Sequence, residues 1–158
     1  MSDAPAADNP RRAEAARPAR ATLRSLAPPE HDAQRAAAMI VHSVSVTVSG
    51  GRASVSVEVR QEGEQSVGVA EGACAGNAIE RLVAEATLRA VAGIDRDAGR
   101  VAIDAVTVAP AGSRSVATAV LVHGEEPFVG VSVIGPGGVA DAVARAVVDA
   151  LARRSASS

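Results

Sequence analysis

The sequence predicts an α+β fold in which a βββα unit occurs twice in tandem, giving a mostly antiparallel sheet with two helices. Three observations support this prediction. Apolar and polar residues alternate over several short segments, which is the period of a half-buried strand. In two later segments, apolar residues recur at helical spacing instead. The order of these segments then repeats with an offset of about 60 residues.

The first repeat is predicted to cover about residues 40–94. Its first strand places His42 on the same apolar face as Val44, and Gly50-Gly51 predicts the hairpin turn that follows. Gly93 is a plausible end for the helix, since glycine commonly follows the last helical residue. In chain order, the expected strands cover 42–48, 53–60 and 66–70, and the expected helix covers 79–93.

The second repeat, about residues 101–153, matches the first element by element. Val106-Thr107-Val108 corresponds to Val46-Thr47-Val48, and Val129-Gly130-Val131 corresponds to Val67-Gly68-Val69. A second helix is predicted from Val139 to about Arg153. This self-similarity is the most specific signal in the chain.

A single domain is predicted for residues 39–154. Residues 1–38 are rich in Pro, Ala and Arg and bury too little apolar surface to offset the entropy of ordering, so we expect a disordered tail there. Residues 155–158 are expected to form a disordered C-terminus. One βββα unit covers its apolar sheet face incompletely. The two helices could therefore share one side of a six-stranded sheet, or each unit could pack on its counterpart in another chain.

The second strands of the two repeats differ in polarity. The outer face of Ala53–Arg60 is polar, whereas its counterpart in the second repeat is apolar on both faces. A strand of that kind is usually covered on both faces, and a second copy of the chain is the predicted cover, which makes a homodimer. The alternative is that the proline-rich tail folds back over this face. The predicted interface residues are Val116, Thr118, Val120, Val122, Phe128 and Ile134.

Gly-rich loops precede both helices and are the candidate ligand sites. Backbone N–H groups at a helix N-terminus favour anions, so a carboxylate or phosphate is the expected ligand class. Neither loop matches a P-loop or a dinucleotide-binding fingerprint, and as turns they need no ligand. The candidate residues are Gly72, Cys74, Gly76, Asn77, Gly135, Gly137 and Gly138.

No catalytic residue, metal site or cofactor is predicted. Cys74 lies just before a helix, where the helix dipole favours a thiolate, but nucleophilic chemistry also needs a nearby base. His42 is expected in the core and His123 at an exposed strand end, and packing under the helix explains Cys74 equally well. Three histidines and one cysteine are scattered without metal-ligand spacing.

Composition excludes several further classes. The chain has 158 residues, a formal net charge of -2 and one aromatic residue, which disfavours a polyphosphate partner and base-stacking surfaces. The βββα order also echoes a double-stranded RNA-binding domain, but the start of the second helix, from Gly135 to Asp141, has no cation to grip phosphates. No secretory signal or membrane span is found, so a cytoplasmic protein without membrane or nucleic-acid partners is expected.

The tandem βββα repeat resembles the C-terminal regulatory, dimerisation domain of 2-isopropylmalate and citramalate synthases. The likeness covers about residues 40–153 and depends on Glu71-Gly72 leading into Ala84–Ala90, and on Ala142–Arg153. The chain also looks like small proteins of GC-rich bacteria with the same repeat. The resemblance to the synthases implies a dimer that binds an amino acid or small carboxylate near the two loops. Since only a tail precedes the repeats here, feedback on a fused catalytic barrel is not expected.

The sequence as a whole therefore predicts a non-catalytic homodimeric module that binds a small molecule or a partner protein, in a regulatory role. A structural or assembly role is the main alternative. Double-stranded RNA binding and an enzyme that uses Cys74 are the less favoured ones.

Overall fold

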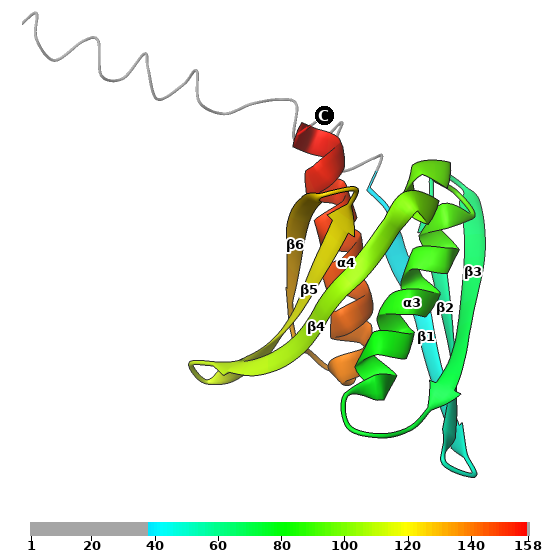
Figure 1. Cartoon of the computed structure of the whole chain (residues 1–158), viewed down its shortest axis with the longest axis vertical. Coiled ribbons are helices and arrows are strands. Elements are labelled where there is room, and N and C mark those ends of the chain that lie inside the picture. Colours follow the sequence, from blue (N-terminus) through cyan, green and yellow to red (C-terminus); the bar gives the residue numbers. More distant parts are fainter. Residues whose placement is uncertain (1–37, 158) are drawn as a thin grey trace, which may run out of the picture. The chain divides into compact units, whose positions relative to one another are not determined.

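The computed structural model describes residues 38–157, so the predicted tail lies, except for residue 38, outside the described residues. Each repeat consists of three strands followed by one helix, as predicted (Figure 1). A 3-10 helix joins the two repeats. The elements are β1 Ile40–Ser49, β2 Arg52–Gln61, β3 Glu64–Ala73, α3 Ala78–Ala92, η2 Arg96–Arg100, β4 Val101–Ala111, β5 Arg114–His123, β6 Glu126–Val133 and α4 Gly138–Ser157.

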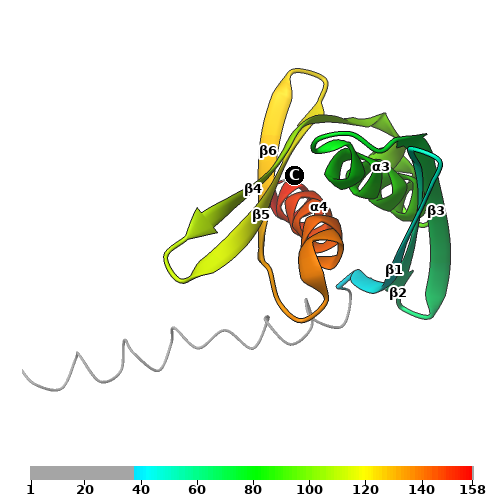
Figure 2. The same ribbon diagram turned by 90° about the horizontal axis from the view of Figure 1, so that it is seen from below.

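The six strands form two antiparallel sheets of three strands each, in the orders β1-β2-β3 and β4-β5-β6. This confirms the α+β class, but the strands do not join into one six-stranded sheet. Both helices lie between the two sheets, and each sheet turns its other face outward (Figure 2). A single chain therefore encloses its own core.

Each helix packs on its own sheet and also on the first strand of the other repeat. Helix α3 contacts β2, β3 and β4, whereas α4 contacts β5, β6 and β1, and the two helices pack against each other. Each repeat thereby completes the core of the other. This exchange explains why the unit occurs twice, because one helix cannot cover a three-stranded sheet alone.

The inner sheet faces carry the alternating residues that the sequence pattern predicts. Val55, Val57 and Val59 of β2 are fully buried, as are Ala117, Ala119 and Leu121 at the corresponding positions of β5. The facing helices bury many alanines, whose small side chains let the helix backbone come close to the sheet. The closest approach is at Gly68 and Gly130, where a Cβ atom would lie 2.0 Å from the Ala86 carbonyl oxygen and 1.9 Å from the Ala146 carbonyl oxygen, respectively.

Both helices also bind the outer strand of their sheet through one charged side chain. A guanidinium nitrogen of Arg89 on α3 donates to the carbonyl oxygen of Val69 in β3. At the corresponding place in the second repeat, Asp149 Oδ2 on α4 accepts from the backbone N–H of Val131 in β6 at 3.0 Å. Each bond uses a main-chain group that an unpaired strand edge leaves without a partner strand.

The largest differences from the predicted boundaries are in the third strand and at the end of the second helix. The third strand, expected at 66–70, covers Glu64–Ala73 and so includes Gly72. Helix α4 continues to Ser157, past the expected end near Arg153 and into the segment 155–158 that was expected to be disordered. The C-terminal extension of α4 carries no apolar stripe that would have predicted it.

His42 was predicted to be a core residue, and this was wrong. A bulge between Val41 and Ser43 interrupts the pairing of β1 with β2 and shifts the alternation of side chains. The imidazole is 43% exposed and its Nε2 lies 3.9 Å from Glu58 Oε1. A corresponding bulge occurs in β4, between Ile103 and Ala105.

Candidate functional site

The candidate site is the outer face of the second sheet. The outward residues of β5 alternate along the strand with the fully buried Ala117, Ala119 and Leu121. They are Val116, Thr118, Val120 and Val122. Cross-strand partners share a face, so the register extends it onto β4 and β6. Besides the four β5 residues, it comprises Ala102, Ala105, Thr107, Ala109, Pro127, Val129, Val131 and Val133. We call these twelve positions the β5 face.

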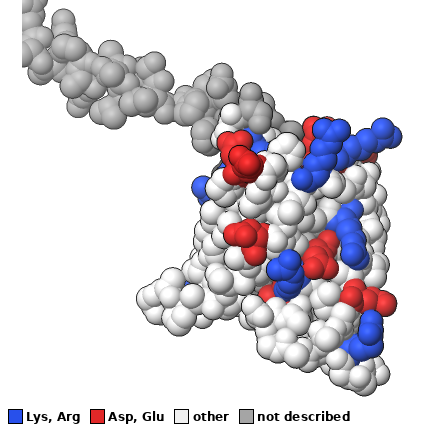
Figure 3. Space-filling model, viewed as in Figure 1, with Lys and Arg blue, Asp and Glu red and all other residues white. Residues whose placement is uncertain are grey.

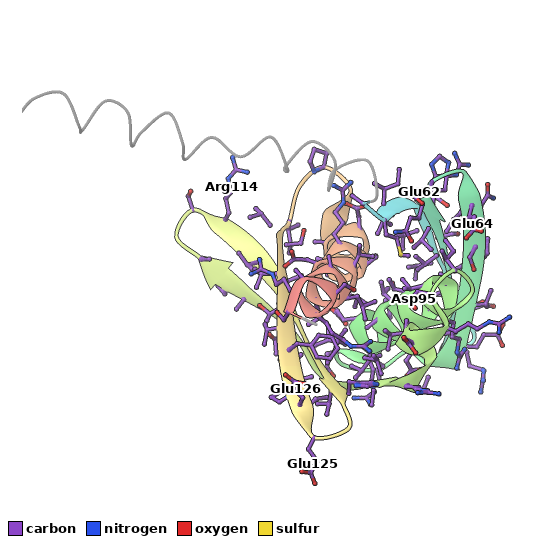
Figure 4. The ribbon with its side chains drawn as sticks, turned by 90° about the horizontal axis from the view of Figure 1, so that it is seen from above. Glu62, Glu64, Asp95, Arg114, Glu125 and Glu126 are labelled. Atoms are coloured by element: carbon purple, nitrogen blue, oxygen red, sulfur yellow. The ribbon has the colours of Figure 1, made fainter. Side chains whose placement is uncertain are left out.

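The β5 face carries no charged side chain at any of these positions. The first charge along β5 on this side is Arg114, at the tip of the β4–β5 hairpin (Figure 4). This projecting hairpin presents mainly uncharged surface (Figure 3). Val129, Val131 and Val133 of β6 are between 44% and 49% exposed. Contiguous apolar surface of this kind is typical of an interaction site.

The outer face of the first sheet provides a comparison within the same chain. Strand alignment through Gly68 and Gly130 places Glu58 where the second sheet has Val120, and Arg60 where it has Val122. Arg60 Nη2 lies 2.8 Å from Glu58 Oε1, and Ser54 donates a hydrogen bond to Glu71 across β2 and β3. The outer face of the first sheet is therefore suited to contact with water, whereas the outer face of the second sheet is not.

Phe128 and Ile134 were predicted on the outer face, and the structure places them elsewhere. Phe128 pairs with the fully buried Leu121, so it points inward, and both Phe128 and Ile134 pack partly buried against the core. Sequence reasoning missed the outward valines Val129, Val131 and Val133 instead. The Val-Gly-Val pattern could have identified them, because the glycine points toward the helix and both of its neighbours therefore point outward.

The two helix-opening loops are short turns closed by their own backbone. The N–H of Ala78 donates to the carbonyl of Ala75 at 3.0 Å, and the N–H of Gly138 donates to the carbonyl of Gly135 at 3.0 Å. Asn77 precedes α3 without a side-chain capping bond, and Gly76 and Gly138 have positive φ angles of 57° and 79°. Gly72 lies within β3, next to Leu82.

Both helix starts carry an acidic side chain in the first turn. Glu80 stands there in α3 and Asp141 in α4. Asp141 Oδ2 lies 2.8 Å from Arg145 Nε, and Glu80 Oε2 is buried without a hydrogen-bond partner among the described residues. These carboxylates already interact favourably with the positive ends of the helix dipoles. They weaken the attraction of either loop for a carboxylate or phosphate ligand.

Gly137 and Gly138 are poor positions for testing the second loop. A Cβ on Gly137 would lie 2.7 Å from the carboxyl group of Asp141, and the positive φ of Gly138 strains any other residue. Gly135 has nothing within 4 Å and no positive φ. It is the position at which a side chain can enter this loop without disturbing the fold.

Cys74 directly follows β3, as Ile134 directly follows β6. The N–H of Cys74 donates to Gly51 at 2.9 Å, and the N–H of Ile134 donates to Ser115 at 2.9 Å. Both side chains are partly buried against the core. His42 lies at the opposite end of the first sheet, as the strand register shows, and His123 ends β5 in the other sheet. Packing against the core explains Cys74 structurally.

Among residues 38–157, no group of three or more His, Cys, Asp or Glu side chains gathers in a way that could hold a metal ion. The turn glutamates Glu62 and Glu64 lie at one hairpin, and Glu125 and Glu126 at another, well apart from them (Figure 4). No protein-family model matches the chain, and no curated protein sequence matches it. None of the helices within the described residues has the length and apolar character needed to cross a membrane.

Proposed function

We propose that this chain is a non-catalytic binding module that works as a homodimer, with the β5 face as the contact between two copies. The observation that carries this proposal is the β5 face, whose positions carry no charge and which has the exposed Asp104 only at the β4 bulge, set against the Glu58–Arg60 pair on the outer face of the first sheet. The two sheets share one fold and one solvent. A difference in polarity between them therefore reflects a difference in what covers them.

A second copy suits this surface better than a charged partner does. The β5 face offers no charge with which to orient a polar protein or a nucleic acid. A flat apolar sheet face is complementary to itself across a two-fold axis, and packing of sheet on sheet is a common way to build a core. Dimerisation would place the valines of β6 in contact with another apolar face instead of water.

Within this proposal, a small carboxylate or amino-acid ligand at the loops Gly72–Asn77 and Gly135–Gly138 stays a prediction. The acidic first turns of both helices count against it. Binding of a partner protein remains the other use of such a module, and it needs no cavity in the loops.

Native mass spectrometry of the full chain as purified tests the proposal. We expect a species with twice the mass of the 158-residue chain. A fixed additional mass on the dimer would support a ligand-binding role and would give the mass of the ligand. A chain that stays monomeric across the micromolar range would contradict the homodimer.

A further inference from the structure

A cavity of about 360 Å³ lies at the end of the second sheet, between the β5–β6 hairpin and the last turns of α4. Its volume is at the lower end of the range typical of small-molecule sites. The residues that define its chemistry are His123, Glu126, Phe128, Val129, Arg153 and Arg154. Neither the two arginines nor this use of Phe128 was predicted from the sequence pattern.

At the place that corresponds to this cavity, the first repeat brings the end of its helix against the sheet. Gly68 packs on Ala86 and Ala90 as Gly130 packs on Ala146 and Ala150, which aligns the two helices with their sheets. In this alignment, Gly93 corresponds to Arg153 and Ser66 to Phe128. Helix α3 ends at Ala92, and Gly93 sits so close to Ser66 that a Cβ would lie 2.1 Å from its hydroxyl oxygen.

The second repeat departs from that arrangement in two ways. Helix α4 continues to Ser157, beyond the point at which α3 stops. The only aromatic residue of the chain, Phe128, stands in place of a serine. The longer helix and the larger side chain together form a cavity where the first repeat closes its chain onto the sheet.

Two arginines, Arg153 and Arg154, and one glutamate, Glu126, line this cavity. The Nε of Arg153 lies 2.9 Å from Asp149 Oδ2, and the same Oδ2 atom accepts the N–H of Val131. Asp149 is thereby fixed by the sheet, and it orients Arg153 through one nitrogen. A guanidinium held in this way presents a planar fork that matches a carboxylate.

We propose that this cavity binds a small carboxylate with an apolar body, the carboxylate at Arg153 and Arg154 and the apolar part against Phe128. The proposal deepens the binding role given above by naming a ligand class and a place for it. Of the β5 face, only Pro127 and Val129 also line the cavity. Binding of the carboxylate does not require the dimer.

Benzoate is a suitable probe, and benzyl alcohol, which has the same ring without the charge, is its control. Titration of the isotopically labelled full chain, followed by amide NMR shifts, should give saturable changes centred on residues 126, 128, 129 and 153. We expect the double variant Arg153→Met/Arg154→Met to bind benzoate at least about tenfold more weakly. The matched control is Arg145→Met, because Arg145 forms the equivalent ion pair with Asp141 on the same helix, 2.8 Å apart.

Three results would overturn the proposal: equal affinity for benzyl alcohol, unchanged affinity in the double arginine variant, or shifts centred on residues 135–141. Phe128→Leu keeps an apolar side chain against the core and should weaken benzoate binding while the spectrum stays dispersed. The oligomeric mass is measured on the same samples. A dimer that does not bind benzoate would reject the proposed cavity ligand alone. A monomer that binds benzoate would reject only the proposed homodimer.

Discussion

Gly130→Ala is expected to lower the free energy of unfolding by at least about 3 kcal/mol, which is a large share of the total stability of a domain of this size. The added Cβ would lie 1.9 Å from the Ala146 carbonyl oxygen and 2.3 Å from the Ala150 nitrogen. Both are backbone atoms of α4, so no side-chain rotation can relieve the clash. The helix would have to move away from the sheet and lose contact with the core.

The repeat makes this prediction testable twice. Gly68→Ala should destabilise to a similar degree, since its Cβ would lie 2.0 Å from the Ala86 oxygen and 2.4 Å from the Ala90 nitrogen. Neither glycine has a positive φ, so the penalty is steric and not conformational. Gly135→Ala is the control, because its Cβ meets nothing within 4 Å. Urea unfolding measures all three variants, and equal midpoints for Gly130→Ala and Gly135→Ala would show that the helix does not approach the sheet this closely.

The double variant Val120→Glu/Val122→Arg is expected to convert the dimer to a monomer, weakening association by about 100-fold or more. It places in the second sheet the Glu58–Arg60 pair that the first sheet carries at the corresponding positions. The fold tolerates such a pair on an outer sheet face, as the first repeat demonstrates. In a symmetric contact each substitution occurs twice, so two pairs of charges would have to lose water at the interface.

The control for this variant is Val67→Arg/Val69→Glu, which adds the same two charges to the outer face of the first sheet. These valines are 53% and 47% exposed and lie on β3, outside the proposed contact. Sedimentation equilibrium should then report a monomer for the first variant and a dimer for the control. If the two variants had the same mass, the β5 face would not be the contact.

The internal repeat is what made the fold predictable from the sequence. Alternation in Ala53–Arg60 and its counterpart in β5 correctly assigned Ala117, Ala119 and Leu121 to the core side and Val120 to the opposite side. The repeated Val-Gly-Val pattern aligned the third strands. These features are local, since they depend only on the period of a strand and on the spacing of like segments.

The remaining features depend on contacts between distant segments. Alternation cannot decide whether β3 pairs with another strand, so the division into two sheets was open. The bulge between Val41 and Ser43 adds a residue to β1 and so changes which residues point to the core. The prediction that His42 lies in the core was wrong for this reason. Phe128 was placed on the wrong face because the alignment of β6 with β5 was not known: Gly130, which packs on α4, has the same parity as Phe128 and assigns it to the inner face.

The cavity beside Arg153 was beyond sequence reasoning for a further reason. Basic residues in the last turn of a helix are common, because they interact favourably with the helix dipole. Their proximity to Phe128 follows only from the packing of α4 on β6. A lone aromatic residue at a position where the sister repeat has serine was the available signal, and it was read as an interface residue.

If a second copy covers the β5 face in solution, it shields the methyl groups of some exposed valines and leaves others open to solvent. Val67 and Val69 are 53% and 47% exposed in one chain, and their counterparts Val129 and Val131 are 44% and 46% exposed. A soluble paramagnetic probe would therefore relax all four to a similar extent in a monomer. In the proposed dimer, it should relax Val67 and Val69 strongly and Val129 and Val131 weakly, and dilution should remove the difference. Equal relaxation at all concentrations, or a protection that does not change on dilution, would contradict the proposed homodimer.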